Sequence, residues 1–112
     1  MSEEEGDTTT LDDTFDALAS HHRRRVLVSL LDHNPQSAQI KRDAAQEGNK
    51  GGESDRLQTA MYHNHLPKLE ARGFISWGRN TNEIEKGSNF EQIRPLLELL
   101  DSHASELPGK WP

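Results

Sequence analysis

Hydrophobic residues recur at helical spacing between residues 55 and 71, and they define the longest predicted helix of the chain. The positions on its apolar side are Leu57, Met61, Tyr62, His65, Leu66 and Leu69. The positions on its opposite side are small or polar: Arg56, Thr59, Ala60, His63 and Asn64. A helix with this pattern can pack its apolar side on a core while the polar side stays available to a partner.

The residues after this helix predict a glycine stop and a β-hairpin. Gly73 can adopt the left-handed conformation that commonly ends helices. A β-prone run at residues 74–78, an asparagine-rich turn at 79–82 and a second run at 83–86 follow it. Trp77, in the first run, is expected to be at least partly buried.

Two shorter helices are predicted before the long one. Thr10 and Asp13 match a capping box that opens the first of them. Its apolar positions, which face one way, are Leu11, Phe15 and Leu18. Ser20 is expected to cap the second helix, which Asn34 and Pro35 should end. The buried side of this second helix is predicted to consist of Val26, Leu27, Leu30 and Leu31.

A third helix is predicted at residues 37–47, with Ile40 and Ala44 on one side. It would form a helix-turn-helix pair with the long helix, although the glycine-rich loop 48–53 between them is longer than the usual tight turn. This loop lacks both the preceding apolar strand and the glycine–lysine spacing of a phosphate-binding loop, so we do not assign it that role.

A last helix is predicted to follow a capping box at residues 88–91 and to continue to Leu107. Its apolar positions fall on one side of the helical wheel and are Phe90, Ile93, Leu96, Leu97, Leu100, Ala104 and Leu107. This stripe is richer than one small domain requires, so we expect burial against a second copy of the chain. The predicted dimer interface, to which the first helix could contribute, consists of Phe90, Ile93, Leu96, Leu97, Leu100 and Ala104.

Two prolines should disturb the helices that contain them. Pro67 is expected to kink the long helix, because its nitrogen cannot donate a hydrogen bond to the carbonyl of His63. Pro95 is tolerated only near the first turn of a helix, so the last helix is expected to begin later than the capping box indicates.

The predicted elements form one α+β domain, mainly helical, with about five helices and a β-hairpin. The 112 residues leave room for a single modest core. We place a disordered acidic tail at residues 1–10, the domain at 11–107, its dimerisation helix at 90–107 and a short tail at 108–112. A helix, a glycine stop and a hairpin in this order are typical of a winged helix-turn-helix.

The composition argues against several classes of function. The chain contains no cysteine, which excludes disulfides, thiolate metal sites and cysteine nucleophiles. No apolar run approaches the roughly 20 residues that span a bilayer, and no secretory signal is visible, so we expect a cytoplasmic protein without membrane contact. No carboxylate pair lies in an apolar context and no serine lies in a nucleophile elbow, so we expect neither enzymatic activity nor a cofactor.

The histidines of the long helix do not predict a metal site. His63 and His65 are two residues apart, so they lie on different sides of a helix and cannot ligate one metal ion together. His65 falls on the apolar side and is expected to be a hydrogen-bonded core histidine.

The charge of the chain gives a mixed indication about nucleic acid. A net charge of −6 opposes DNA binding, because neutralisation of phosphates by basic residues drives that affinity. However, 8 arginines and 5 lysines against 19 carboxylates resemble the usage of proteins from a salty cytoplasm, where acidic surfaces are general. The densest basic run is residues 21–25. We expect at least one of its arginines to contact the DNA backbone, and we select Arg24 and Arg25. The alternative for this run is an ordinary solvated helical turn.

Two segments of the chain resemble ArsR-like winged-helix proteins: ALASHHRRRVLVSLL at residues 17–31 and HNHLPKLEARGFISW at residues 63–77. They are more similar still to a group of small haloarchaeal winged-helix proteins of largely uncharacterised function. The resemblance implies a dimeric DNA-binding regulator with the long helix in the major groove and the hairpin beside it. The residues that it places on DNA are Arg56, Thr59, Ala60 and His63 on the helix, with Arg79 on the hairpin. We add Asn80, next to Arg79 in the asparagine-rich turn, to the predicted DNA contacts.

Two functions therefore remain open. The first is a DNA-binding transcriptional regulator that binds double-stranded DNA as a homodimer. The alternative is a winged-helix module that binds a protein partner without specific DNA binding, which the acidic balance and the leucine-rich last helix favour.

Overall fold

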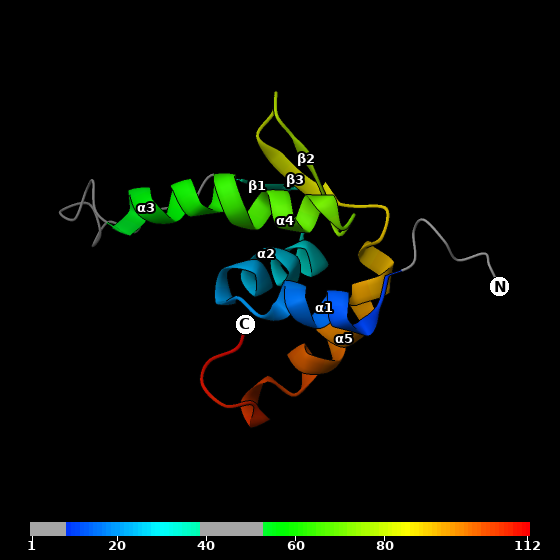
Figure 1. The fold of residues 1–112 in the computed structure, drawn as a ribbon. Coiled ribbons are helices and arrows are strands. Elements are labelled where there is room, and N and C mark those ends of the chain that lie inside the picture. Colours follow the sequence, from blue (N-terminus) through cyan, green and yellow to red (C-terminus); the bar gives the residue numbers. More distant parts are fainter. Residues whose placement is uncertain (1–8, 39–52) are drawn as a thin grey trace.

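The computed structural model describes residues 9–38 and 53–112 and shows an α+β fold that is mainly helical (Figure 1). The elements in chain order are α1 (Leu11–Leu18), α2 (His21–Asp32), β1 (Gln36–Ser37), α3 (Glu53–Ala60), the π-helical turn η3 (Met61–His65), α4 (Leu66–Ala71), β2 (Ile75–Gly78), β3 (Glu83–Lys86), α5 (Phe90–Ser102) and the 3-10 turn η4 (Ala104–Glu106). Helix α2 lies between the long helix α3–α4 on one side and α1 with α5 on the other. The predicted α+β, mainly helical class is confirmed.

The described residues contain four helical segments longer than one turn, where about five were predicted: α1, α2, the continuous α3–α4 helix and α5. The predicted third helix, residues 37–47, is wrong at its start, because Ser37 belongs to strand β1. Its residues 39–47, the loop residues 48–52 and the tail residues 1–8 lie outside the described part of the chain. No helix within that part is long and apolar enough to cross a membrane.

The three strands form one antiparallel sheet in the order β1-β3-β2. In the hairpin, Trp77 pairs with Ile84, and the amide of Asn82 donates to the carbonyl of Gly78 over 2.7 Å. Asn82 has a φ of 57°, a left-handed conformation that asparagine tolerates better than most residues. The predicted hairpin, with its turn at residues 79–82, is confirmed, and Trp77 is partly buried as expected.

The long helix is continuous but contains one π-helical turn, which accommodates Pro67. Because Pro67 has no amide hydrogen and its ring needs room, the preceding turn widens and the amide of Leu66 donates to the carbonyl of Met61. The disturbance expected at Pro67 therefore takes the form of a π turn at η3. Met61, Leu66 and Leu69 remain on the buried side of the helix.

Gly73 ends the long helix as predicted. Its φ is 79°, its amide donates to the carbonyl of Glu70, and the next amide, of Phe74, donates to the carbonyl of Leu69. This pair of bonds is a Schellman motif, which satisfies carbonyls that the helix end would otherwise leave unpaired. A side chain at Gly73 would come within 2.6 Å of the Asn89 side-chain nitrogen, so the position has no room for a Cβ.

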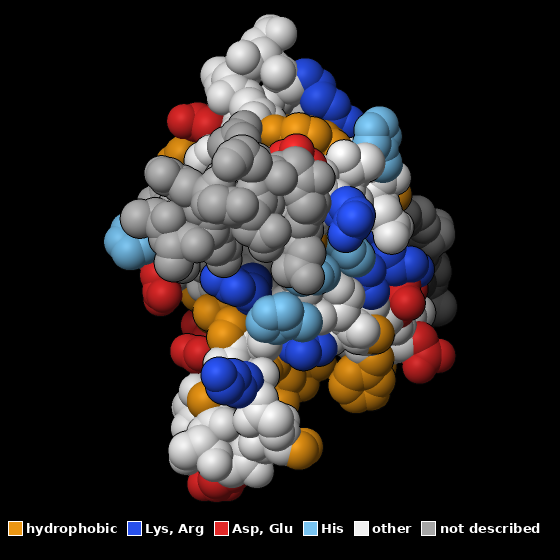
Figure 2. Space-filling model, turned by 90° about the vertical axis from the view of Figure 1, so that its left-hand side faces the viewer, with side chains coloured by type: hydrophobic (Ala, Val, Ile, Leu, Met, Phe, Trp, Pro, Cys, Tyr) orange, Lys and Arg blue, Asp and Glu red, His pale blue; other side chains and the backbone are white. Residues whose placement is uncertain are grey.

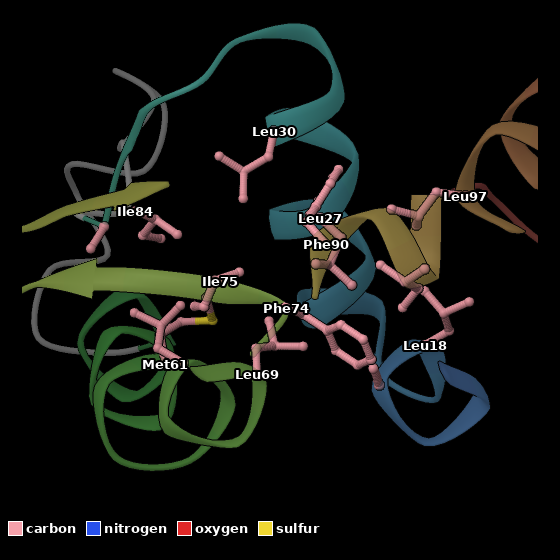
Figure 3. Close-up of a cluster of buried hydrophobic side chains, with 14 residues drawn as sticks. Leu18, Leu27, Leu30, Met61, Leu69, Phe74, Ile75, Ile84, Phe90 and Leu97 are labelled. Atoms are coloured by element: carbon pink, nitrogen blue, oxygen red, sulfur yellow. The ribbon is translucent and has the colours of Figure 1, made fainter. Parts of the chain in front are cut away.

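The core lies between α2, the end of the long helix, the sheet and α5 (Figure 3). Phe74 and Phe90 are its largest fully buried side chains. The other fully buried large residues come from three helices and are Leu27, Leu30, Leu66, Leu69, Ile93 and Leu97. The predicted buried side of α2 is confirmed for Leu27 and Leu30, while Val26 and Leu31 pack at the margin of the core.

Helix α1 begins with the predicted capping box, but of its predicted apolar stripe only Leu18 lies in the core. Thr10 and Asp13 form the reciprocal bonds of the box. The buried residues of α1 are Thr14, Ala17 and Leu18, whereas Leu11 and Phe15 are 64% and 53% exposed. Helix α1 therefore packs on the core through three residues and leaves the large apolar side chains of Leu11 and Phe15 on the surface.

Helix α5 differs from its prediction at both ends. It begins at Phe90 without a side-chain cap, because the Asn89 side chain donates to the carbonyl of Arg72 instead. Pro95 lies inside the helix rather than in a later first turn. The helix ends at Ser102, so Ala104 falls in η4 and the predicted dimerisation helix 90–107 is too long.

Candidate nucleic-acid interface

The polar side of the long helix is exposed, as its sequence pattern predicts. Arg56, Thr59, His63 and Asn64 are exposed and Ala60 is half-buried. No described residue forms a hydrogen bond or ion pair with the Arg56 guanidinium or the His63 ring, so both are available to a ligand. The apolar side of the same helix holds this face in place, because Met61, Leu66 and Leu69 are fixed in the core.

Arg79, the predicted wing residue, does not extend freely into solvent. Its guanidinium lies over the Trp77 ring, with Cζ 3.9 Å from the ring centroid. The same group pairs with the Glu70 carboxylate, with 3.1 Å between Nη2 and Oε1. Sequence reasoning missed Glu70, because it is nine positions from Arg79 and meets it only when the hairpin folds back along the helix end. Asn80, also predicted to contact DNA, is exposed at the tip.

A second stack fixes the hairpin on the long helix. The Tyr62 and Trp77 rings lie 5.4 Å apart and nearly parallel, at 17°. Asn82 connects them, donating to the Tyr62 hydroxyl over 2.9 Å and accepting from the Trp77 indole nitrogen over 3.3 Å. These contacts set the position of the hairpin relative to the exposed helix face. The apolar spacing of Tyr62 and the β-prone Trp77 were the only sequence signals for them.

Two arginines of the basic run have structural roles. Arg23 is 8% exposed and donates to the carbonyls of Ala17 (3.0 Å) and Asp16 (2.9 Å). Arg24 donates to the carbonyl of Leu18 over 2.8 Å. These carbonyls belong to the last turn of α1, where helix carbonyls commonly lack a partner within the helix, and the Asp16 carbonyl also accepts from the amide of Ala19. The hydrogen bond to the Leu18 carbonyl therefore disfavours the predicted contact of Arg24 with the DNA backbone.

Arg25 is the exposed arginine of the basic run at residues 21–25, whereas Arg24 is half-buried. Arg24 also lies near the Trp111 ring, with Cζ 6.0 Å from its centroid, so the C-terminal segment covers it. Arg25 is exposed, and no described residue holds its guanidinium by a hydrogen bond or ion pair. Of the two arginines selected from the sequence, Arg25 keeps the geometry of a phosphate contact.

His65 joins the long helix to α2. Its Nδ1 lies 3.0 Å from Nη1 of Arg23, and because arginine only donates, Nδ1 must accept and carry no proton. Burial, the Arg23 charge and the nearby His22 lower the pKa of His65 below its ordinary value. The predicted hydrogen bond of His65 is confirmed, but the residue is half-buried and does not belong to the core. Within residues 9–38 and 53–112, no group of three His, Asp or Glu side chains is arranged to hold a metal ion.

A cluster of ion pairs joins α1 to the end of the long helix. Lys68 and Arg72 pair with Asp16, and Arg72 also pairs with Asp13. The Thr10 amide and the Arg72 charge lower the pKa of Asp13, and the hydrogen bond from Lys68 lowers that of Asp16. This cluster uses two basic residues of the long helix within the fold, so they add little to a DNA-binding face.

The predicted dimer interface is wrong for three of its six residues. Phe90, Ile93 and Leu97 are 1%, 0% and 0% exposed within the single chain, so a second copy cannot contact them. Leu96, Leu100 and Ala104 are half-buried. The exposed apolar residues lie elsewhere: Leu11 and Phe15 on α1 and Leu99, 55% exposed, on α5. A shallow groove between α1 and α5 is lined by Thr9, Thr10, Leu11, Thr14, Gln92, Pro95 and Leu96.

Residues 15–85 match the model of a family described as a domain of unknown function, DUF7344. The chain belongs to this family. The matched DUF7344 region includes α2, the long helix and almost the whole hairpin, and it ends before α5. No curated protein and no solved structure matches the chain significantly.

Proposed function

We propose that this DUF7344 chain is a DNA-binding transcriptional regulator that acts as a homodimer. The long helix enters the major groove, and the β2–β3 hairpin lies on the flanking backbone as a wing. The observation that carries the proposal is the exposed polar face of the long helix, held on the core beside a hairpin that is stacked on the same helix. The strand order β1-β3-β2 also fits a winged helix.

The side chains on this face have the chemistry that reads base edges. Arginine can donate two bonds to guanine, and asparagine can pair with adenine through its amide. Arg56 and Asn64 supply these groups, with Thr59 and His63 between them on the same side of the helix. We assign Arg25 and the hairpin tip to phosphates, since such contacts position a protein without reading sequence.

The distribution of charge supports this choice of face. The chain is acidic overall, with a net charge of −6. Figure 2, which looks at the end of the molecule where α3 begins, nevertheless shows several Lys, Arg and His side chains among the described residues, with acidic side chains mainly at the margins of the view. A locally basic face on an acidic molecule can steer DNA to one side of the protein.

A homodimer would pair α1 and α5 of two copies through the exposed residues Leu11, Phe15 and Leu99. A two-fold interface uses the same patch on both subunits, so one self-complementary apolar patch suffices. Two long helices related in this way would address two half-sites, and the DNA site would be palindromic.

The proposal is tested by selecting duplexes from a random-sequence pool with the full chain at several salt concentrations. We expect enrichment of a palindrome whose affinity falls steeply as salt rises. Folded protein that enriches no sequence and shows no salt-dependent affinity for any duplex would contradict it.

A protein-binding module is the second candidate, and one observation favours it. Four basic side chains that could have faced DNA, those of Arg23, Arg24, Lys68 and Arg72, are instead engaged within the fold. Because few cations of residues 9–38 and 53–112 stay unengaged, the exposed apolar residues of α1 and α5 would then bind a different protein, and the selection experiment would return no palindrome.

A further inference from the structure

The guanidinium of Arg79 is held in a two-pronged ion pair with Glu70, between the hairpin and the end of the long helix. Nη2 donates to Oε1 of Glu70 over 3.1 Å and Nη1 donates to Oε2 over 3.4 Å. Nη1 also donates to the carbonyl of Trp77 over 3.1 Å. Glu70 therefore takes both prongs of the guanidinium that could otherwise hold two oxygens of a ligand.

The same guanidinium is oriented by aromatic rings beneath it. It lies over the Trp77 ring, with Cζ 3.9 Å from the ring centroid, and Trp77 in turn stacks on Tyr62 of the long helix. Arginine stacked on an aromatic face keeps its orientation at small entropic cost, because the planar group has few other positions. If the Glu70 carboxylate moved away, the fork of Arg79 would still point outward from a rigid support.

We propose that Arg79 on the Trp77–Tyr62 stack is a binding site for a nucleic-acid backbone phosphate, and that Glu70 occupies this site as a competing anion when DNA is absent. The inference rests on the proposed DNA-binding function and goes beyond it by assigning an antagonist to a named contact. A carboxylate and a phosphate offer the same pair of oxygens to a guanidinium, so one can replace the other.

The exposure of the pair makes such an exchange feasible. The Arg79 and Glu70 side chains are 58% and 35% exposed, so water can replace either partner. Exposed ion pairs contribute little to stability, which means that a phosphate can displace Glu70 at small cost. The carboxylate thus weakens binding to any DNA backbone without blocking it. Non-specific DNA, which offers only backbone contacts, would lose proportionately more affinity than a specific site.

The test compares DNA affinity among the wild type and three variants by fluorescence anisotropy with a labelled duplex of mixed sequence. Glu70→Gln removes the competing charge and keeps the side-chain shape. Glu85→Gln is the matched control, because Glu85 is an exposed hairpin carboxylate that forms no ion pair with Arg79. Glu70→Gln combined with Arg79→Ala removes the proposed site together with its competitor. Thermal melting of each variant confirms that it is folded.

We expect Glu70→Gln to bind the duplex about two- to fivefold more tightly than both wild type and Glu85→Gln. The gain is small because DNA binding to the wild type has to break only one exposed ion pair, which the variant lacks. The gain should disappear when Arg79→Ala is added. If wild type binds DNA but Glu70→Gln is no better than Glu85→Gln, the inference is wrong and the proposed function stands. If none of the folded proteins binds the duplex at any salt concentration, both are wrong.

Discussion

Arg23 shows that adjacent residues of one basic run can have different roles. Within the run of residues 21–25 it resembles its two neighbours, yet it is buried while Arg25 is exposed. Burial follows from position, because Arg23 faces the end of α1 and the side of the long helix. A charged group is tolerated there because two carbonyls and His65 accept its hydrogen bonds.

The first prediction separates the two arginines. Arg23→Ala should lower the free energy of unfolding by about 2–4 kcal/mol, because it leaves the Ala17 carbonyl without its donor and removes the hydrogen bonds to the Asp16 carbonyl and to His65. Arg25→Ala should change it by less than about 0.5 kcal/mol, since the side chain is exposed. Urea unfolding measures both. Equal losses in the two variants would show that Arg23 is not the structural member of the run.

The second prediction concerns pH and His65. Its pKa is lowered in the folded chain by burial, the Arg23 charge and His22, so the unfolded chain binds a proton first as pH falls. Stability should therefore be complete above the unfolded pKa of about 6.5 and decline as pH falls below it. The pKa of His22 is also lowered, by burial, His21 and Arg25, and adds to the decline.

His65→Asn provides the control for this pH dependence. Asparagine can still accept a bond from Arg23 but does not titrate. The urea midpoint of this variant should fall less steeply between pH 7.5 and pH 5.5 than that of the wild type, with the remaining slope due to His22. Identical slopes would assign the pH dependence to groups other than His65.

Residue exposure on the long helix was predictable, but partners were not. Helical spacing alone placed Arg56 and His63 outside and Leu66 inside. Glu70 and Arg79, or Arg23 and His65, lie far apart along the chain, so their contacts depend on how the elements pack. No local pattern encodes such a contact.

At the scale of elements, turn chemistry carried most of the predictable information. The capping box of α1, the Ser20 cap and the Gly73 stop each depend on neighbouring residues, and each forms. The box predicted for α5 does not form, because the helix begins one residue later than the box requires, with Asn89 and not Ser88 as its N-cap, and the Asn89 side chain donates to the Arg72 carbonyl across the Gly73 turn. A distant partner can thus override a local cap.

The third prediction tests the Gly73 turn. Gly73→Ala should lower the free energy of unfolding by more than about 2 kcal/mol. A left-handed backbone costs alanine about 1–2 kcal/mol, and the added Cβ also clashes with the Asn89 side chain. Gly109→Ala is matched to it, with a φ of 74° and no atom near the added Cβ. If thermal unfolding shows the same loss for both, the Asn89 contact is unimportant.

At the scale of the whole molecule, the burial of residues along α5 differs from the single apolar stripe that its sequence pattern predicts. The sequence predicts one apolar stripe, but part of it, with Phe90, Ile93 and Leu97, completes the core of the single chain. The sequence could not show which stripe residues pack within the chain and which stay exposed. Helical periodicity identifies the apolar side of a helix but not the element that packs against it. What remains outside, with Leu11 and Phe15, is the surface that we propose a second copy covers.

The fourth prediction concerns this surface. Phe15→Glu and Leu99→Glu should each convert a dimer to a folded monomer in sedimentation equilibrium, because they place charges in an apolar contact. Thr59→Glu, which adds the same charge on the long helix, should remain dimeric. Leu97→Glu should fail to fold, since Leu97 is fully buried. Dimers that persist in both Phe15→Glu and Leu99→Glu would place the interface elsewhere.

The most direct measurement of function is the affinity of wild type and Arg56→Ala for a selected palindromic duplex and a scrambled one, each at several salt concentrations. Wild type should prefer the palindrome, and its affinity for both duplexes should fall as salt rises. Arg56→Ala should lose roughly 1–3 kcal/mol of that preference while binding the scrambled duplex almost as before, because a base contact and not a phosphate contact has been removed. Wild-type protein that is folded and dimeric but shows no salt-dependent affinity for either duplex would contradict DNA binding by this face.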